Sequence, residues 1–388
     1  MLWREKMKTG KLLKVLTCLI SALLIITSVP LYAAALDEAD YDGVSYPYYG
    51  EDAYSYLESV KVKNQRAQAI IEYIYASYGD GYYRYKGSGQ CYGYAEMTRK
   101  LFGTRYKERK YGIKATRKNL YKKLKKLKPG THVRFSAAAN GSRNPSHSIV
   151  LLKINKDTIW YTDGNYDDNN GIRIDERSLA DLAYSTQNNG YKYLAWTREP
   201  RGSIPAVNEP EPKAFDEGLG KGTNIVWRPV KGAKSYVVYR SLKKKSGYKK
   251  IATVKKSRYH YTDKTKGVYG RVYYKVVAVK SGGKKAKSAP VRVNRPLTAP
   301  RVYMKMHYED EEPWFELTWE PVKGATRYKI YRYDYDKDKM VKLATVKGKK
   351  WIHRIGDDEG YLELYITAAT TRKGSESLPE VMDIYTGW

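Results

Sequence analysis

The feature that most constrains the fold of this 388-residue chain is an internal repeat in its second half. The segment 225–240 reads Ile-Val-Trp-Arg-Pro-Val-Lys-Gly-Ala-Lys-Ser-Tyr-Val-Val-Tyr-Arg. It returns at 317–332 as Leu-Thr-Trp-Glu-Pro-Val-Lys-Gly-Ala-Thr-Arg-Tyr-Lys-Ile-Tyr-Arg, a shift of 92 residues (319 − 227). Each copy is followed by short segments of alternating hydrophobicity, which is the pattern of strands with one buried face. Two repeated units of this length, each with an early Trp and short strands, predict two β-sandwiches.

The shared motif Trp-x-Pro-Val-x-Gly-Ala-x-x-Tyr-x-x-Tyr-Arg resembles that of fibronectin type III modules. The resemblance covers residues 213–388 and implies two all-β modules, at 213–296 and 297–388. Such modules usually carry no chemistry, so it implies that they are spacers or wall-binding units. We expect Trp227 and Trp319 to be core residues. The preceding segment 201–212 is Pro-rich, which predicts a semi-stiff linker.

The first 35 residues have the composition of a secretory signal peptide. A basic head is followed by the apolar run 15–29 and then by the small residues Ala33-Ala34-Ala35. Since this apolar core is short for a membrane span, we expect contact with the membrane only through this segment. The pattern predicts a secreted or cell-surface protein of a Gram-positive-type bacterium, and export makes nucleic acid a poor partner.

The charge balance indicates an anionic partner. The chain has 72 Lys and Arg against 41 Asp and Glu, a formal net charge of +31. A strongly basic protein is attracted to anionic surfaces, and for an exported protein we expect these to be anionic cell-wall polymers. The sequence shows no His/Cys cluster at metal-ligand spacing, so we expect no metal and no cofactor.

Export also changes the meaning of the two cysteines. Cys18 lies in the signal segment, so Cys91 is the only thiol of the mature chain. A lone thiol in an exported protein has no internal disulfide partner. This favours a free reactive thiol over a buried inert cysteine, which is the alternative interpretation.

The region 36–200 predicts an α+β domain, because helical spacing is followed by segments with a strand pattern. Helices are expected within 53–78 and at 92–102, 118–127 and 178–184. Strands are expected at 132–135, 148–154, 158–163, 172–174 and 193–197. Cys91 would then stand at the start of a helix, whose N-terminus carries about half a positive charge and favours the thiolate.

A thiol nucleophile needs a base and a group that orients the base. His132 and His147 are the candidates for the base, and we favour His147 because it heads a strand of the core. Asp163 and Asn165 are the candidates for the orienting group, since alternate residues of a strand point the same way. A carboxylate would stabilise an imidazolium more strongly than an amide would. The alternative for 163–165 is a simple turn.

These motifs resemble the CHAP amidohydrolases/peptidases, which belong with the NlpC-type and papain-like cysteine peptidases. The resemblance rests on Gly89-Gln90-Cys91 opening a helix, Pro129-Gly130 before a strand, His147 leading a strand, and an acid-x-Asn motif at 163–165. It covers residues 85–197, of which only these short motifs are shared. The resemblance implies a papain-like α+β fold.

The same resemblance implies the role of each residue. Cys91 attacks an amide carbonyl, and His147 acts as base and then as acid. Asp163 and Asn165 steady His147, with Asp163 standing where CHAP domains usually have Glu. Gln90 faces the tetrahedral oxyanion together with the backbone N–H of Cys91.

The sequence therefore predicts a secreted cysteine-dependent amide hydrolase, a peptidase or amidase that acts on peptidoglycan or another peptide substrate. Two alternatives stay open. Transglutaminase-like acyl transferases also have the order Cys, His, Asp with Trp-Tyr shortly before the Asp, as at 160–163, although the 56-residue interval from Cys91 to His147 (147 − 91) is longer than theirs. The other alternative is a non-catalytic cell-surface binding protein.

Overall fold

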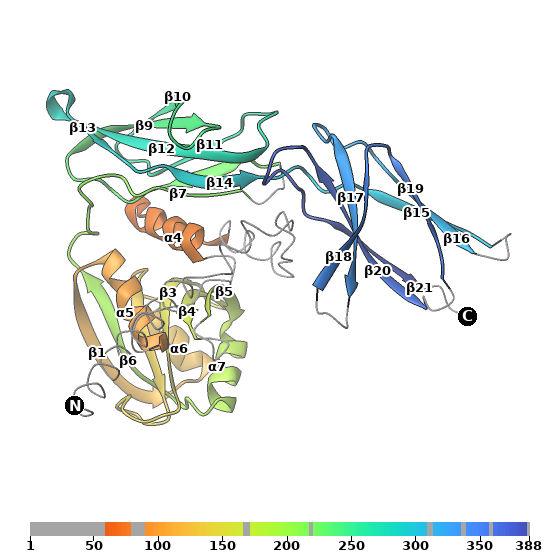
Figure 1. The fold of residues 1–388 in the computed structure, drawn as a ribbon. Helices are drawn as coiled ribbons and strands as arrows, with labels where there is room; N and C mark the ends of the chain where they lie inside the picture. The colour runs from red at the N-terminus through yellow and green to blue at the C-terminus, as the bar shows by residue number, and fades with distance from the viewer. Residues whose placement is uncertain are drawn as a thin grey trace, which may run out of the picture.

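The computed structural model describes residues 59–78, 90–165, 171–216, 220–308, 313–334, 339–356 and 360–385. The predicted signal peptide and the glycines at 87 and 89 lie outside the described residues. An α+β domain is followed by two β-sandwiches (Figure 1). Among the described residues, no helix is both long enough and apolar enough to cross a membrane.

The α+β domain is built on one six-stranded sheet with the strand order β1-β6-β2-β3-β4-β5. All neighbouring strands pair antiparallel. The strands are β1 (Arg105–Lys114), β2 (Thr131–Ser136), β3 (Ser146–Ile154), β4 (Thr158–Gly164), β5 (Ile172–Ser178) and β6 (Tyr193–Arg201). The centre of β3, residues 149–152, is at most 1 % exposed, as expected for a central strand covered on both faces.

The helices of this domain pack on both faces of the sheet. They are α4 (Gln65–Tyr78), α5 (Gln90–Phe102), α6 (Arg117–Leu124) and α7 (Leu179–Asn188). Ile149 and Leu151 of β3 pack in a cluster with leucines of α6 and α7. Leu152 and Trp160 point to the other face, where they cluster with Phe102 of α5 and with α4. The apolar side chains of β3 therefore alternate between the two faces of the sheet, and each set packs against one layer of helices.

The helices and strands predicted for this domain are present in the structure with shifted ends, and one strand was not predicted. The basic segment 105–114 was not predicted to be regular, yet it forms β1 and pairs with β6. Its residues are mostly exposed, and an exposed edge strand has no alternating apolar pattern to reveal it. The helix predicted at 118–127 is α6, which ends at Leu124. The strand predicted at 172–174 extends to Ser178 as β5, and Ser178 then caps α7 by accepting from the Asp181 N–H at 3.0 Å.

The first sandwich pairs a three-stranded sheet, β11-β8-β7, with a sheet of order β10-β9-β12-β13, in which β14 also pairs with β12. Its strands are β7 (Lys213–Phe215), β8 (Thr223–Val226), β9 (Ala233–Ser241), β10 (Lys249–Lys255), β11 (His260–Asp263), β12 (Gly270–Lys280), β13 (Lys285–Lys287) and β14 (Val291–Arg295). A 3-10 turn at Ser281–Gly283 links β12 to β13.

The second sandwich repeats this arrangement, with sheets of order β15-β16-β19 and β18-β17-β20-β21. Its strands are β15 (Val302–His307), β16 (Trp314–Trp319), β17 (Arg327–Asp334), β18 (Lys339–Val346), β19 (Lys350–Arg354), β20 (Tyr361–Ala369) and β21 (Glu380–Tyr385). Trp227 and Trp319 lie in the two cores, which confirms that prediction. The repeat also preserves a hydrogen bond, because the hydroxyls of Tyr236 and Tyr328 accept from the backbone N–H groups of Val230 and Val322.

Helix α4 lies between the α+β domain and the first sandwich (Figure 1). One side of it belongs to the core of its own domain, whereas Ala69 belongs to the core of the sandwich. Tyr75 packs edge-on against Phe215 of β7, with ring centroids 4.9 Å apart. Glu72 Oε2 lies 3.2 Å from Nδ1 of His260 in β11. The helix therefore joins the two domains mainly through apolar contacts.

Candidate active site

Cys91 is the second residue of α5, and its side chain is buried, at 8 % exposed. Gln90 before it is exposed and has a left-handed backbone, with φ of 43°. Helix α5 packs against β3 and β4, and the Tyr94 hydroxyl hydrogen-bonds with Thr162 of β4 at 2.7 Å. The thiol therefore lies at the N-terminus of a helix that is held against the centre of the sheet.

His147, the second residue of β3, lies between the thiol and a buried carboxylate. Its Nε2 hydrogen-bonds with Asp163 Oδ2 at 2.9 Å, and its ring also hydrogen-bonds with the Cys91 thiol. Tyr191 stacks on the ring, with centroids 5.8 Å apart. Cys91, His147 and Asp163 therefore form one hydrogen-bonded chain.

Asp163 is fully buried in β4, with Arg173 of β5 opposite it in the sheet. Arg173 donates from Nε to Oδ1 at 2.9 Å and from Nη2 to Oδ2 at 3.2 Å. Burial raises the pKa of Asp163, but the charge of Arg173 and the hydrogen bond of His147 outweigh it, and the pKa is lowered. Asp163 is therefore ionised at neutral pH. A buried carboxyl can be ionised only where partners such as these stabilise its charge.

The pKa values of His147 and Cys91 move in opposite directions. Burial lowers the pKa of His147, but its hydrogen bonds with Asp163 and Cys91 raise it to about 9. Burial raises the pKa of the Cys91 thiol, yet His147, the backbone N–H of Ser148 and the charge of Arg134 bring it below the ordinary value. These directions favour a thiolate–imidazolium pair, the reactive state of a thiol nucleophile.

The predicted direction of the Asn165 side chain assumed that the strand with Asp163 continues to residue 165, but it does not. Strand β4 ends at Gly164, and Asn165 has a left-handed backbone with φ of 61°. Its Nδ2 donates to Gln90 Oε1 at 3.4 Å. Asp163 is thus the residue of this segment that contacts the imidazole, while Asn165 reaches the side-chain oxygen of Gln90.

His132 is fully buried and has a different environment. Its Nδ1 hydrogen-bonds with Glu96 Oε1 at 2.7 Å, and its Nε2 with Ser148 Oγ at 2.8 Å. Burial lowers the pKa of His132, and the charges of Arg198 and Arg134 lower it further, which outweighs the effect of Glu96. A neutral histidine whose two nitrogens are both occupied is a packing element that links α5, β2 and β3.

Sequence reasoning missed the arginines around the site. Arg173 anchors Asp163, and Arg134 acts on the thiol from β2, where it lies opposite Ser148 of β3. Both are placed by the register of the sheet, and no local pattern in the sequence marks them. Among the described residues, no group of three or more His, Cys, Asp or Glu side chains could hold a metal ion.

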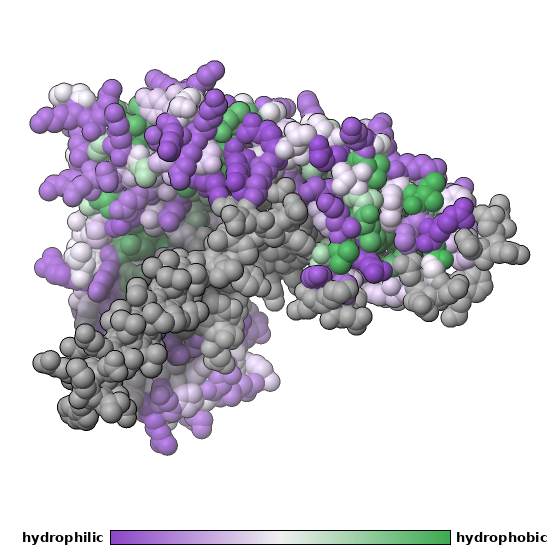
Figure 2. All heavy atoms as spheres, in the orientation of Figure 1, coloured by the Kyte–Doolittle hydropathy of each residue, from purple (hydrophilic) through white to green (hydrophobic). Residues whose placement is uncertain are grey.

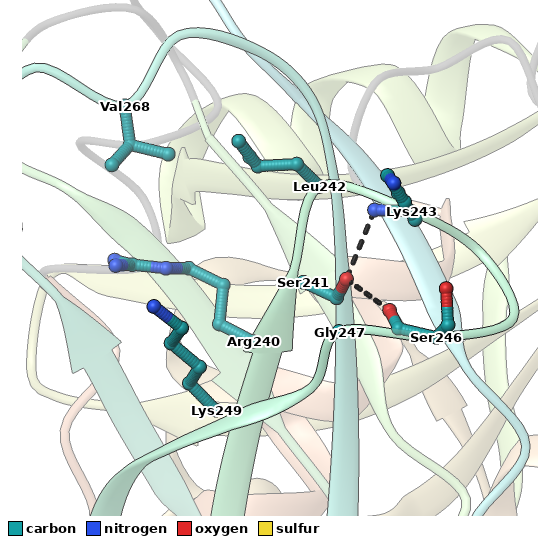
Figure 3. Close-up of a pocket in the computed structure, with 8 residues that line it drawn as sticks. All are labelled: Arg240, Ser241, Leu242, Lys243, Ser246, Gly247, Lys249 and Val268. Carbon is teal, nitrogen blue, oxygen red and sulfur yellow. Dashed lines mark hydrogen bonds between the residues drawn. The ribbon is translucent and has the colours of Figure 1, made fainter.

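A cavity of about 360 Å³ lies in the first sandwich and shares no residue with the thiol cluster. Figure 3 shows it beside the β9–β10 turn, where Ser241 accepts from the Lys243 N–H and donates to the Ser246 carbonyl. Its basic side chains are Arg240, Lys243 and Lys249, of which Arg240 is paired with Asp263 at 2.8 Å. This cavity is a cationic surface feature of the sandwich.

No family model matches the chain, and no curated protein matches it. The similar solved structures include an Fn3-like protein from Clostridium thermocellum, 32 % identical over 24 % of this chain and 96 % of that chain, with a TM-score of 0.21. A two-domain fibronectin type III segment of chicken tenascin is 15 % identical over 46 % of this chain and 99 % of that one, with a TM-score of 0.34. The chicken interferon gamma receptor alpha chain is 11 % identical over 48 % of this chain and 100 % of that one, with a TM-score of 0.27.

The cysteine peptidase resemblance of the N-terminal domain stays a prediction beside these findings. In the C-terminal part, the repeated motif, the two buried tryptophans and the repeated pairing of a three-stranded with a larger sheet all agree. The described residues between 213 and 385 form fibronectin type III-like, all-β domains.

Proposed function

We propose that this chain is an exported, cysteine-dependent amide hydrolase with a papain-like α+β domain, and that its substrates are peptidoglycan peptides. The observation that supports the chemistry best is the hydrogen-bonded chain Cys91–His147–Asp163, which raises the pKa of His147 and lowers that of the thiol. A base, its orienting group and a nucleophile in this order are the components of thiol catalysis.

In this mechanism the Cys91 thiolate attacks the amide carbonyl and forms a C–S bond. The carbonyl electron pair moves to oxygen, where the Cys91 backbone N–H and the Gln90 side chain stabilise the oxyanion. His147 then gives its proton to the amine nitrogen, the C–N bond breaks and the amine leaves. For deacylation, His147 takes a proton from water, the water oxygen attacks the thioester, and the Cys91 thiolate leaves. Asp163 keeps the imidazolium oriented throughout.

The sandwiches are proposed to hold the enzyme at the wall or to act as spacers. The β9–β10 turn and the start of β10 carry exposed lysines at 243–245 and 249–250, and hydrophilic side chains cover much of the visible face of this sandwich (Figure 2). Positive charges attract anionic wall polymers at low salt and are screened at high salt. Export through the predicted signal peptide would bring the protein to these polymers.

The test of this function is to incubate the purified mature protein with cell-wall sacculi and to follow the release of free amines. We expect release from the wild type and none from Cys91→Ala. The absence of release from wild-type protein, or equal release from Cys91→Ala, would contradict the proposal. Addition of a small primary amine distinguishes acyl transfer, since a transferase incorporates the amine into the sacculi. A non-catalytic binding protein would bind the sacculi and release nothing.

A further inference from the structure

Arg134 is a cation beside the thiol that the mechanism above does not use. It lies in the central strand β2, its side chain is partly exposed, and its charge lowers the pKa of Cys91. Its Nη1 donates to Ser148 Oγ at 3.0 Å and its Nη2 to Ser146 Oγ at 2.6 Å. Both acceptors belong to β3. Because strand side chains alternate, they and the guanidinium lie on the opposite face of the sheet from the His147 side chain, the face on which His132 reaches Glu96 of α5.

The contacts of Arg134 with the described residues include no carboxylate. The neighbouring Arg198 differs, because it pairs with Glu108 at 2.9 Å and with Glu96 at 3.3 Å. Two of the five N–H donors of Arg134 are used by serines, so among the described residues three stay available for an acceptor.

The ring of Tyr92 packs against this guanidinium, and Trp196 lies beside that ring. Its Cζ atom lies 5.6 Å from the centroid of the Tyr92 ring, and Tyr92 follows the nucleophile directly in α5. Trp196 of β6 lies opposite Arg134 in the sheet. Its ring is 9 % exposed and is packed edge-on against Tyr92, with centroids 6.3 Å apart. The two serine hydroxyls and the Tyr92 ring together hold the guanidinium in one place, and a planar donor fork fixed in this way matches a carboxylate.

We propose that Arg134 is a specificity residue that binds a free carboxylate of the substrate next to the scissile amide. The preferred substrates are then acidic peptides, in which a carboxylate lies within a few bonds of the carbonyl that Cys91 attacks. This inference rests on the proposed function for its substrate, but the anion site itself is open to a test that needs no hydrolysis.

The test compares alkylation of Cys91 by iodoacetate with alkylation by iodoacetamide in the purified mature protein. In both reactions the thiolate attacks the CH₂ carbon, the C–S bond forms and iodide leaves. The reagents differ mainly in the carboxylate of iodoacetate. Removal of Arg134 also changes the thiolate fraction, but this affects both rates equally, so the ratio of the two rates reports on anion binding alone.

We expect Arg134→Gln to lower the iodoacetate-to-iodoacetamide rate ratio by about tenfold, the usual effect of removing one charge-assisted hydrogen bond. Arg134→Lys keeps the positive charge but lacks the planar donor fork, so its rate ratio should lie between those of the wild type and Arg134→Gln. Arg105→Gln is the matched control, since it removes one exposed positive charge beyond the other end of α5. An unchanged ratio in both Arg134 variants, or an equal decrease in Arg105→Gln, would overturn the proposal.

A second measurement uses sacculi whose carboxylates have been converted to neutral amides. If Arg134 binds a substrate carboxylate, wild-type protein cleaves untreated sacculi faster than amidated ones, and Arg134→Gln loses this preference. Equal cleavage of both by the wild type would contradict the inference. If Cys91 is alkylated but neither preparation is cleaved, the proposed hydrolysis fails, while the alkylation ratio still decides whether the anion site exists.

Discussion

Two buried histidines, each with a carboxylate partner, have opposite protonation in this protein. The pKa of His147 is raised to about 9, whereas that of His132 is lowered. The difference comes from the third neighbours, because His147 also faces the Cys91 thiol, whereas His132 faces two arginines. A carboxylate partner therefore does not by itself make a base of a buried histidine. What decides is the sum of the charges around the ring.

Asp163→Asn should weaken the thiolate–imidazolium pair. The thiolate–imidazolium pair of the wild type persists up to the pKa of His147, about pH 9, and is lost as the pH rises through it. An amide stabilises the imidazolium less than a carboxylate does, so the pKa of His147 falls and that of Cys91 rises. We expect iodoacetamide alkylation at pH 6 to slow by roughly tenfold or more, one pKa unit being one factor of ten.

The measurement is the alkylation rate from pH 4 to pH 10, with Asp157→Asn as the control because Asp157 is exposed and pairs with Arg117. The wild-type profile should begin well below the ordinary thiol pKa. An Asp163→Asn profile that overlays the wild type would show that Asp163 does not set the protonation of the pair.

Glu96→Gln should change the stability of the domain and its dependence on pH. Burial raises the pKa of Glu96, but its hydrogen bonds with His132 and Arg99 lower it to about 2. A carboxylate with a lowered pKa contributes stability that is present above its ordinary value, 4.5, and is lost as the pH falls towards 2. We expect the variant to lose about 1–3 kcal/mol of unfolding free energy at pH 7 and to be less sensitive to acid over that window.

Urea unfolding between pH 2 and pH 7 measures both effects. Because Glu96 holds His132 and does not contact the thiol pair, alkylation of Cys91 at pH 6 should stay within a few-fold of the wild type. A much larger loss of thiol reactivity than of stability would instead place Glu96 in the reactive cluster.

At the scale of elements, side chains of helix α5 pack closely against two glycines, where a larger residue would not fit. A Cβ on Gly164 would lie 3.0 Å from the Cβ of Tyr94, and one on Gly130 would lie 2.1 Å from the Phe102 ring. Gly130 also has φ of 84° and donates its N–H to Leu151 at 2.7 Å. These contacts set the depth at which α5, and with it Cys91, lies against β3 and β4.

We therefore expect Gly130→Ala to destabilise the α+β domain by about 2–4 kcal/mol, from overpacking against Phe102 together with the strained backbone. Gly202→Ala is a matched control, because φ there is 83° and a Cβ would meet nothing within 4 Å. Thermal or urea unfolding of both variants separates the clash from the backbone strain. Equal losses in the two would mean that the contact with Phe102 contributes nothing.

At the scale of the whole molecule, α4 couples the α+β domain to the first sandwich. Its Ala69 lies in the sandwich core and its Tyr75 packs on Phe215. Loss of that ring should destabilise both domains, because α4 belongs to both cores. We expect Phe215→Ala to cost about 2 kcal/mol, less than a fully buried Phe, since Phe215 is only half-buried.

The measurement for this variant is hydrogen exchange, read out separately for α4 and for the strands of each domain. Protection should fall in both α4 and β7 and stay unchanged in the second sandwich. Tyr184→Ala is the control, because this ring is 71 % exposed on α7. A loss of protection confined to β7 would show that the two domains unfold independently.

The sequence by itself determined the elements and residues that depend on local pattern. The repeat around Trp227 and Trp319 predicts both sandwiches, because a strand with one buried face needs an alternating pattern. Cys91 at a helix start and His147 at the head of an apolar strand follow from hydrophobic periodicity. Both residues lie in the hydrogen-bonded chain of the candidate site.

Only the tertiary structure decided which residues complete that chain. Asp163 contacts His147 and Asn165 does not continue the strand, because β4 ends at Gly164 and the next residue is left-handed. Arg173 and Arg134 reach the site through pairing across strands. The physical reason is range: periodicity reports which face of an element is buried, whereas strand register and the charges around a buried ring are set by residues distant in the chain.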